Sequence, residues 1–151
     1  MPRIPPLVLA FEAVLATDSP FLPKPTGKVS RTIAVRDDQT LEHLHEALRL
    51  AFGWADPHLH AFWIGTKFWD QDAVRYSAPF ELEEGELSSK TKLIEVGLVK
   101  GSKLAYLFDY GDEWRLLLTV VDTWPAADDL YPMLVDAEGI PPPQYLGVDD
   151  D

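Results

Sequence analysis

All four histidines of the chain fall in two copies of the tripeptide His-Leu-His, at residues 43–45 and 58–60. Neutral imidazole nitrogens bind zinc and other divalent metals, and a carboxylate such as that of Asp109 or Asp112 is a suitable further ligand. The alternative is that the imidazoles are structural and form hydrogen bonds inside the folded protein. The direction in which each ring points decides between these interpretations.

The two tripeptides are expected on different kinds of secondary structure. Residues two apart point the same way on a strand, but on a helix they diverge by about 200°. Because the first tripeptide is expected on a helix, His43 should face solvent while His45 borders the apolar face. A metal site would therefore combine His58 and His60 with His45 and one acid, and structural histidines are the favoured interpretation.

The acidic segment DYGDE at residues 109–113 is the second group that could do chemistry. Two close carboxylates, Asp109 and Asp112, could divide acid–base work between them or hold a divalent cation. The structural interpretation is a hairpin turn, in which Gly111 adopts a positive φ and these acids accept hydrogen bonds from nearby backbone amides. No adjacent nucleophile, phosphate-binding glycine loop or lysine supports catalysis, so we expect a hairpin turn that also lines a groove.

Aromatic side chains are the third feature, because the chain has five Trp residues. Such rings can form a ligand-binding cleft, but they more often belong to the core. The sequence alone assigns no catalytic residue, metal or cofactor. The candidate binding residues are His45, His58, His60, Asp109, Asp112 and Trp114.

One helix, over residues 41–52, is expected to position the first tripeptide. Thr40 is a suitable N-cap, Glu42 lies in the first turn, and Gly53 follows the last residue of the apolar pattern. We expect the apolar stripe of this helix to pack on a sheet. The stripe consists of Leu41, Leu44, Ala47, Leu48, Ala51 and Phe52.

Strands are expected on both sides of this helix. Residues 7–16 and 28–36 read as two strands joined by a Pro-rich loop, and the second of them alternates and is rich in β-branched side chains. Residues 59–70 predict a short hairpin with its turn at residues 65–66. Residues 104–121 predict a long hairpin around the acidic segment.

These elements indicate the α+β fold class. We expect a single compact domain over residues 1–151, with a mixed or antiparallel sheet of about five to six strands packed on the one main helix of residues 41–52. Beyond Trp124 the chain is acidic and Pro-rich. This C-terminal segment is expected to wrap the surface largely without regular structure.

The net charge of −12 limits the possible partners. After Arg115 the chain has no Lys or Arg, and binding to a phosphate backbone needs clustered positive charge, so a nucleic-acid partner is not expected. The chain has no Cys, which excludes disulfides and thiolate metal sites. Without a visible targeting segment or a run of about 18 apolar residues, we expect a cytoplasmic protein with no membrane partner.

Three blocks of sequence occur in one order: TLEHLHEALRLAFGWADPHLHAFWIG, YLFDYGDEW and LYPMLVDAEGIPPPQYLG. Together, over about residues 28–147, they resemble the plasmid pRiA4b ORF-3-like family. In the third block, Leu134 and Gln144 stand where the family has a Cys and an acidic residue, which weighs against a metal or catalytic role there. The matching positions include His45, His58, His60, Asp109, Asp112 and Trp114.

The resemblance implies a compact α+β domain in a bacterial protein, and it supplies no mechanism. The leading hypothesis is a non-enzymatic module that binds a protein or a small ligand in a groove between the acidic turn and the second His-Leu-His. An alternative is a metal-dependent hydrolase that uses His58, His60, Asp109 and Asp112. A weaker alternative is an accessory protein of a mobile element that acts near nucleic acid, which the charge opposes.

Overall fold

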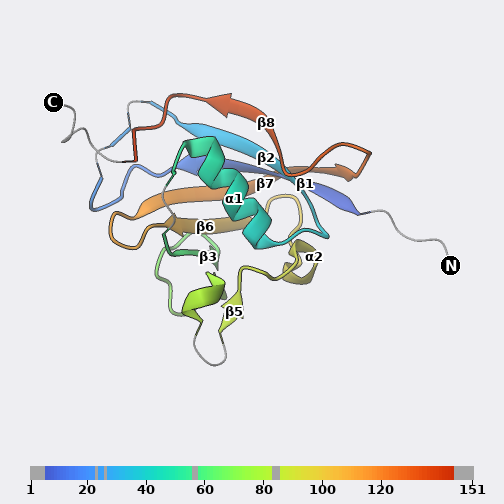
Figure 1. Cartoon of the computed structure of the whole chain (residues 1–151), viewed down its shortest axis with the longest axis horizontal. Coiled ribbons are helices and arrows are strands. Elements are labelled where there is room, and N and C mark those ends of the chain that lie inside the picture. The colour runs from blue at the N-terminus through green and yellow to red at the C-terminus, as the bar shows by residue number, and fades with distance from the viewer. Residues whose placement is uncertain (1–5, 23, 26, 56–57, 83–85, 145–151) are drawn as a thin grey trace.

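The main feature of the computed structural model, which describes residues 6–22, 24–25, 27–55, 58–82 and 86–144, is one eight-stranded sheet (Figure 1). The order of the strands across the sheet is β5-β4-β3-β6-β7-β1-β2-β8. Neighbouring strands are antiparallel except for the pair β4 and β5. In chain order the strands are β1 (Leu7–Leu15), β2 (Ser30–Arg36), β3 (His60–Ile64), β4 (Arg75–Ser77), β5 (Leu87–Ser88), β6 (Lys103–Phe108), β7 (Trp114–Pro125) and β8 (Met133–Glu138).

Three helical segments accompany the sheet in the described part of the chain: α1 (Leu41–Phe52), α2 (Leu93–Val96) and the 3₁₀ helix η1 (Pro79–Glu81). The side chain of Thr40 accepts a hydrogen bond from the backbone N–H of His43, and Gly53 ends α1 with a left-handed φ of 79°. The predicted bounds of this helix are confirmed. None of the described helices has the length and apolar character that a membrane crossing requires.

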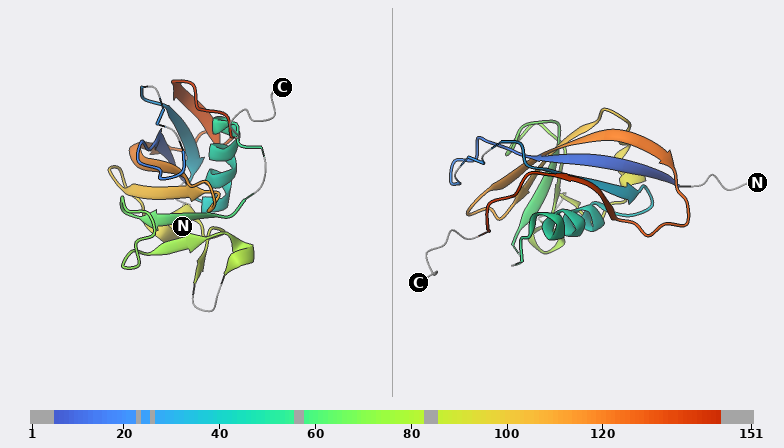
Figure 2. Two further views of the ribbon diagram at one scale, coloured as in Figure 1. Left: turned by 90° about the vertical axis from the view of Figure 1, so that its left-hand side faces the viewer. Right: turned by 90° about the horizontal axis from the view of Figure 1, so that it is seen from above.

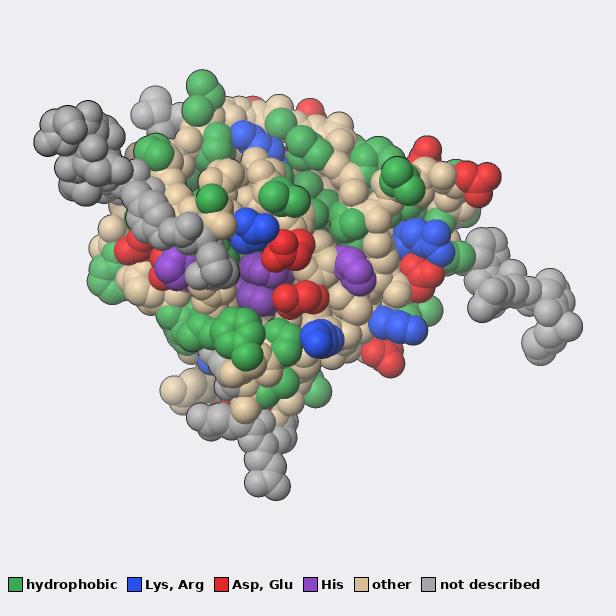
Figure 3. Space-filling model, in the orientation of Figure 1, with side chains coloured by type: hydrophobic (Ala, Val, Ile, Leu, Met, Phe, Trp, Pro, Cys, Tyr) green, Lys and Arg blue, Asp and Glu red, His purple; other side chains and the backbone are tan. Residues whose placement is uncertain are grey.

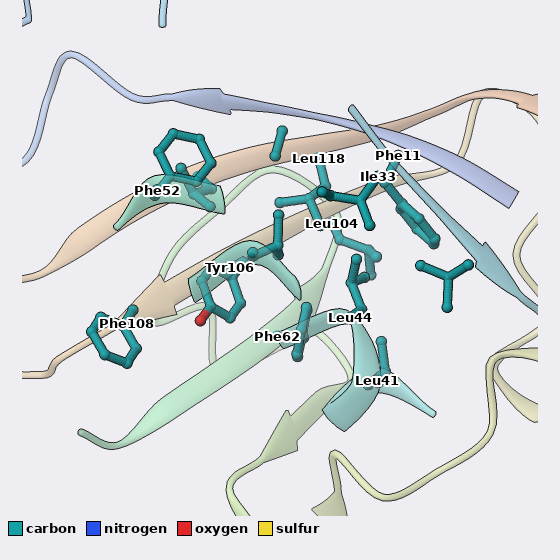
Figure 4. Close-up of a cluster of buried hydrophobic side chains, with 14 of the residues drawn as sticks. Phe11, Ile33, Leu41, Leu44, Phe52, Phe62, Leu104, Tyr106, Phe108 and Leu118 are labelled. Carbon is teal, nitrogen blue, oxygen red and sulfur yellow. The ribbon is translucent and has the colours of Figure 1, made fainter. Parts of the chain in front are cut away.

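Helix α1 lies along one face of the sheet (Figures 1 and 2). The helix buries Leu41, Leu44, Leu48 and Phe52, and the close-up in Figure 4 shows its apolar side chains among those of the strands. His45 is buried on the same side of the helix. The helix therefore carries one imidazole into the layer between itself and the sheet.

The long hairpin predicted for residues 104–121 is confirmed as β6 and β7. Tyr106 pairs with Leu116 and Phe108 pairs with Trp114, all four of which are buried. β3 pairs with the other side of β6, with His60 opposite Phe108. This pairing brings the second His-Leu-His close to Tyr106 and beneath α1.

The predicted fold class was wrong about the sheet. Instead of about five to six strands packed on one main helix, a large eight-stranded sheet dominates, with two α-helices in the described residues. β4 and β5 have only three and two residues, which is too short to leave an alternating pattern in the sequence. A single domain over residues 1–151 stays a prediction.

The C-terminal segment, predicted to be largely without regular structure, contains one regular element among its described residues, β8. β8 pairs with β2 at the edge of the sheet. Most of its side chains are exposed, including Asp136 and Glu138. An edge strand with an exposed face lacks the apolar pattern that identifies a buried strand.

The short hairpin predicted within residues 59–70 does not form. The strand that follows β3 in the chain is β4, and the two strands pair antiparallel. They are separated by a loop of ten residues instead of a two-residue turn. Trp69 has a φ of 58°, which is incompatible with an extended strand. Its ring packs edge-on against Trp63, with 5.2 Å between the ring centroids, and this contact fixes the loop on the sheet.

Candidate metal centre

Three polar side chains meet in the layer between α1 and the sheet: Glu42, His45 and His60. Glu42 and His45 are three residues apart on α1, so they lie on the same side of the helix. His60 is the first residue of β3. One ligand atom from each residue can be chosen so that all three lie within 4.8 Å of one another.

The imidazole rings of His45 and His60 are stacked, with 3.5 Å between their centroids and 6° between their planes. Nε2 of His60 lies 3.1 Å from Oε1 of Glu42 and 3.2 Å from Oγ of Ser89. The Ser89 hydroxyl donates a hydrogen bond of 2.5 Å to the same oxygen of Glu42. Oε1 of Glu42 is therefore within hydrogen-bonding distance of both a hydroxyl oxygen and an imidazole nitrogen.

Tyr106, on β6, contacts the other imidazole. Its hydroxyl oxygen lies 2.7 Å from Nδ1 of His45, and both side chains are buried. Burial raises the pKa of the Tyr106 phenol well above its usual range, so the hydroxyl stays protonated and can either donate or accept.

Two tautomers of His45 fit this arrangement. When Nε2 carries the proton, it can donate to Glu46, whose Oε2 is 3.3 Å away. When Nδ1 carries the proton, it donates to Tyr106 and leaves the lone pair of Nε2 for a metal. A histidine that binds a metal commonly donates its other N–H in this way.

The surroundings of Glu42 and His45 keep both groups in the protonation state that a metal requires. Burial, followed by the charge on His60, lowers the pKa of His45 from 6.5 to about 3, so its ring is neutral at pH 7. Partial burial raises the pKa of Glu42, but hydrogen bonds with His60 and Ser89 outweigh it and bring the pKa to about 2. Neutral imidazole and ionised carboxylate are the forms that coordinate metals.

The other ring nitrogen of His60 has an unusual environment. Nδ1 is buried and has no hydrogen-bond partner among the described residues. A buried polar atom without a partner costs about 1–3 kcal/mol of stability. A metal bound through Nε2 leaves Nδ1 without a partner as well, so this atom does not distinguish a metal-binding His60 from a structural one.

The three side chains form part of the wall of an open cleft of about 340 Å³. Glu46, Arg49, Ala55, His58 and Phe80 form the rest of the described wall. Figure 3 shows histidine, acidic and basic side chains gathered near the middle of this face. A larger cavity of about 420 Å³ between α1 and β8 is lined mainly by apolar side chains. The buried imidazoles and the carboxylate of Glu42 line the smaller cleft instead.

The structure brings together some of the candidate residues and separates others. His45 and His60 meet, whereas His58 pairs with Asp109 at 3.5 Å between Nε2 and Oδ2. Trp114 belongs to the core, where its ring centroid lies 5.4 Å from that of Trp54. The exposed position of His43 and the buried position of His45 are confirmed.

The acidic segment forms a hairpin turn, but its backbone differs from the prediction. The positive φ values belong to Asp109, at 67°, and Glu113, at 59°, and not to Gly111. Oδ1 of Asp109 accepts hydrogen bonds from the backbone N–H groups of Gly111 and Asp112, at 3.0 and 3.3 Å. An aspartate tolerates the left-handed region because its side chain can bond local backbone in this way.

Glu42 and Ser89 belong to the cluster but were not among the candidate residues. The spacing Glu-x-x-His at residues 42–45 is a signal that could have identified Glu42, because it places a carboxylate and an imidazole on the same side of a helix. Nothing in the sequence distinguishes Ser89 from other serines, and only the folding of residues 86–92 against α1 brings it to Glu42.

The fold and the cluster define an α+β protein in which a helix and a sheet together hold two imidazoles and a carboxylate. The chain belongs to the plasmid pRiA4b ORF-3-like protein family, whose profile matches residues 22–149. The predicted family is thereby confirmed.

Two relatives illustrate what the chain resembles. It is 31% identical over 122 residues to the uncharacterized protein y4hQ of Sinorhizobium fredii, a match that covers 79% of this chain and 59% of that protein. The chain therefore spans about three fifths of the length of this relative. The crystal structure of MM3350, a protein of unknown function from Methanosarcina mazei Go1, is similar in fold, with a TM-score of 0.71 and 19% identity over 92% of this chain and 73% of that chain.

Proposed function

We propose that the protein is a metal-dependent binding module, which holds a divalent transition metal through Glu42, His45 and His60 and binds a ligand in the adjoining cleft. The observation that supports this most directly is that one ligand atom from each residue lies within 4.8 Å of the others. Two imidazoles and one carboxylate form the ligand sets of several catalytic zinc sites and of the non-haem iron(II) triad.

The types of ligand atom favour zinc, iron(II) and neighbouring transition metals. Ca²⁺ and Mg²⁺ prefer oxygen ligands, and two of the three ligand atoms here are nitrogens. Three protein ligands leave at least one coordination position of a tetrahedral metal for water or for another molecule. Because the cleft lies beside Glu42, His45 and His60, that position is accessible from it.

Metal binding requires one of the two stacked imidazole rings to rotate, because their planes are only 6° apart and a metal binds in the plane of each ring. Ligand atoms around a tetrahedral zinc are about 3.3 Å apart when each lies about 2.0–2.1 Å from the metal. Because Glu42 and His60 are already 3.1 Å apart, most of the shift falls on His45. Tyr106 and Ser89 then orient the ligands, since Tyr106 accepts a hydrogen bond from His45 and Ser89 donates one to Glu42.

A metal-dependent hydrolase is the second candidate, and one observation favours it. His58 lines the same cleft and is paired with Asp109. A histidine paired with an aspartate can exchange a proton with water or substrate, and a metal lowers the pKa of its bound water. The sequence predicted that such an enzyme would use His58, His60, Asp109 and Asp112. In the structure Asp109 is paired with His58, so the carboxylate ligand of the metal would be Glu42 instead of an aspartate.

Metal analysis of the purified protein tests the proposal. The protein is stripped with a chelator, loaded with Zn²⁺ and desalted, and the wild type is expected to retain about one equivalent of zinc. Glu42→Gln and His60→Ala should retain less than about a tenth of that amount, with circular dichroism used to verify that each variant is folded. The control is His43→Ala, which removes an exposed histidine of the same helix and should retain the wild-type amount.

Two results would contradict the proposal. One is a wild type that retains no zinc after desalting. The other is a His60→Ala variant that retains as much zinc as the wild type. Loss of zinc in His58→Ala would instead identify a ligand set that contains His58.

A further inference from the structure

We infer that the cleft beside the metal site takes a small organic monocarboxylate whose other end is aromatic or apolar. This inference rests on the proposed function, because the carboxylate would bind the open position of the metal. It is supported by the charge balance of the cleft and by the side chains that form its outer wall.

The charge balance favours a ligand with one negative charge. A divalent metal bound to the ionised Glu42 leaves one positive charge, because His45 and His60 bind as neutral ligands. Glu46 and Arg49 form an ion pair with 3.0 Å between Oε1 and Nη2, so these two residues add no net charge. A monocarboxylate therefore neutralises the site.

Phosphate fits the same cleft less well. Arg49 is the only Lys or Arg among the described residues of the cleft wall, and its guanidinium is already engaged. Nε and Nη2 donate to Glu46, and Nη1 donates to the backbone oxygens of Trp54 and Ala55. A doubly charged phosphate normally requires several cationic or amide donors, and these four bonds leave only one of the five N–H groups of Arg49 for it.

The outer wall supplies a surface for an apolar group. Phe80, in η1, is 76% exposed although it lines the cleft, and Ala55, just beyond α1, is exposed there too. An aromatic ring that packs against Phe80 removes apolar area of both rings from water. A volume of about 340 Å³ admits a small molecule of this kind.

The test uses protein loaded with Co²⁺ in place of zinc, because the visible absorption of bound Co²⁺ changes when a ligand enters its coordination shell. Acetate, benzoate and inorganic phosphate are titrated in parallel. We expect benzoate to bind about 10-fold more tightly than acetate, and phosphate to bind more weakly than benzoate. Phe80→Ala removes the ring that benzoate would contact. The ratio of the benzoate affinity to the acetate affinity should therefore fall to about 1–2 in this variant.

The matched control is Phe21→Ala, which removes a phenylalanine that is 61% exposed and is not among the residues of the cleft wall. This variant should keep the wild-type ratio. The inference is overturned if phosphate binds as tightly as benzoate, if Phe80→Ala keeps the 10-fold ratio, or if none of the three anions changes the spectrum. These failures leave the proposed function intact, whereas a wild type that takes up no Co²⁺ contradicts both.

Discussion

The imidazole rings of His45 and His60 lie face to face, with 3.5 Å between their centroids and only 6° between their planes. Two protonated rings at this separation would repel each other by roughly 5 kcal/mol at an effective dielectric constant of about 20. A single cation shared by the two rings would avoid this repulsion. Glu42, beside both rings, supplies the negative charge that such a cation needs.

The stability of the metal-free protein should fall in acid. The folded-state pKa of His45 is about 3 against 6.5 in the unfolded chain, so the unfolded state binds more protons between these values and stability falls as the pH drops below about 6.5. Glu42, with a pKa of about 2 against 4.5, adds a loss in the same direction below about pH 4.5.

Urea denaturation of chelator-treated protein at pH 7, 5 and 4 measures this effect. His45→Asn removes the titrating imidazole, so its free energy of unfolding should change less between pH 7 and pH 5 than that of the wild type. His43→Asn, on the exposed side of the same helix, is the matched control. Equal pH dependence in His45→Asn and the wild type would show that His45 is not held neutral by the fold.

Tyr106→Phe should weaken zinc binding by about 10- to 100-fold, because it removes the hydroxyl that orients His45 while keeping the buried ring. Isothermal titration with Zn²⁺ measures the affinity. Tyr131→Phe, which removes a hydroxyl near Asp129 outside the cleft, is the control and should bind zinc like the wild type. If Tyr106→Phe binds zinc with unchanged affinity, the Tyr106 hydroxyl has no part in orienting the metal ligand.

The parts of the fold that follow from local signals could be predicted from the sequence. Thr40 and Gly53 mark the ends of α1, and alternation in residues 104–118 gives the pairing of Tyr106 with Leu116. β8 could not be found in this way, because it is an exposed edge strand whose pairing with β2 spans about a hundred residues of sequence. Local patterns do not encode such a pairing.

The candidate site was predictable to a similar degree. Helical phase separates the exposed His43 from the buried His45, and the sequence shows this directly. The stacking of His45 on His60 depends on where β3 passes beneath α1, which no spacing in the sequence specifies. The pairing of His58 with Asp109 depends on β3 and β6 being neighbours, so the sequence placed both residues among the candidates but did not show that they contact each other.

Leu48→Ala should lower the free energy of unfolding by about 2–5 kcal/mol, because Leu48 is fully buried between α1 and the sheet and its truncation leaves a cavity. Urea denaturation at pH 7 measures the change. Leu50→Ala, on the same helix but 69% exposed, is the matched control and should cost less than about 1 kcal/mol. Similar costs for the two variants would contradict the packing of α1 described above.

Asp109→Ala should destabilise the protein by about 2 kcal/mol, since it removes two hydrogen bonds to the turn and leaves a residue that resists a positive φ. Asp109→Asn keeps the accepting oxygen and tolerates the left-handed region, so it should stay within about 1 kcal/mol of the wild type. Thermal melts with and without Zn²⁺ compare the variants. An Asp109→Ala variant that is more stable than the wild type without metal would indicate repulsion between carboxylates instead of a turn.

Anomalous diffraction from a zinc-soaked crystal, recorded at the zinc absorption edge, is the most direct test of the proposed metal site. We predict one strong peak about 2.0–2.2 Å from a carboxylate oxygen of Glu42 and from one ring nitrogen each of His45 and His60. We also expect His45 to move towards His60 and Glu42 relative to the metal-free protein. A peak at His58 and Asp109, or no peak in the cleft at saturating zinc, would contradict the proposed site.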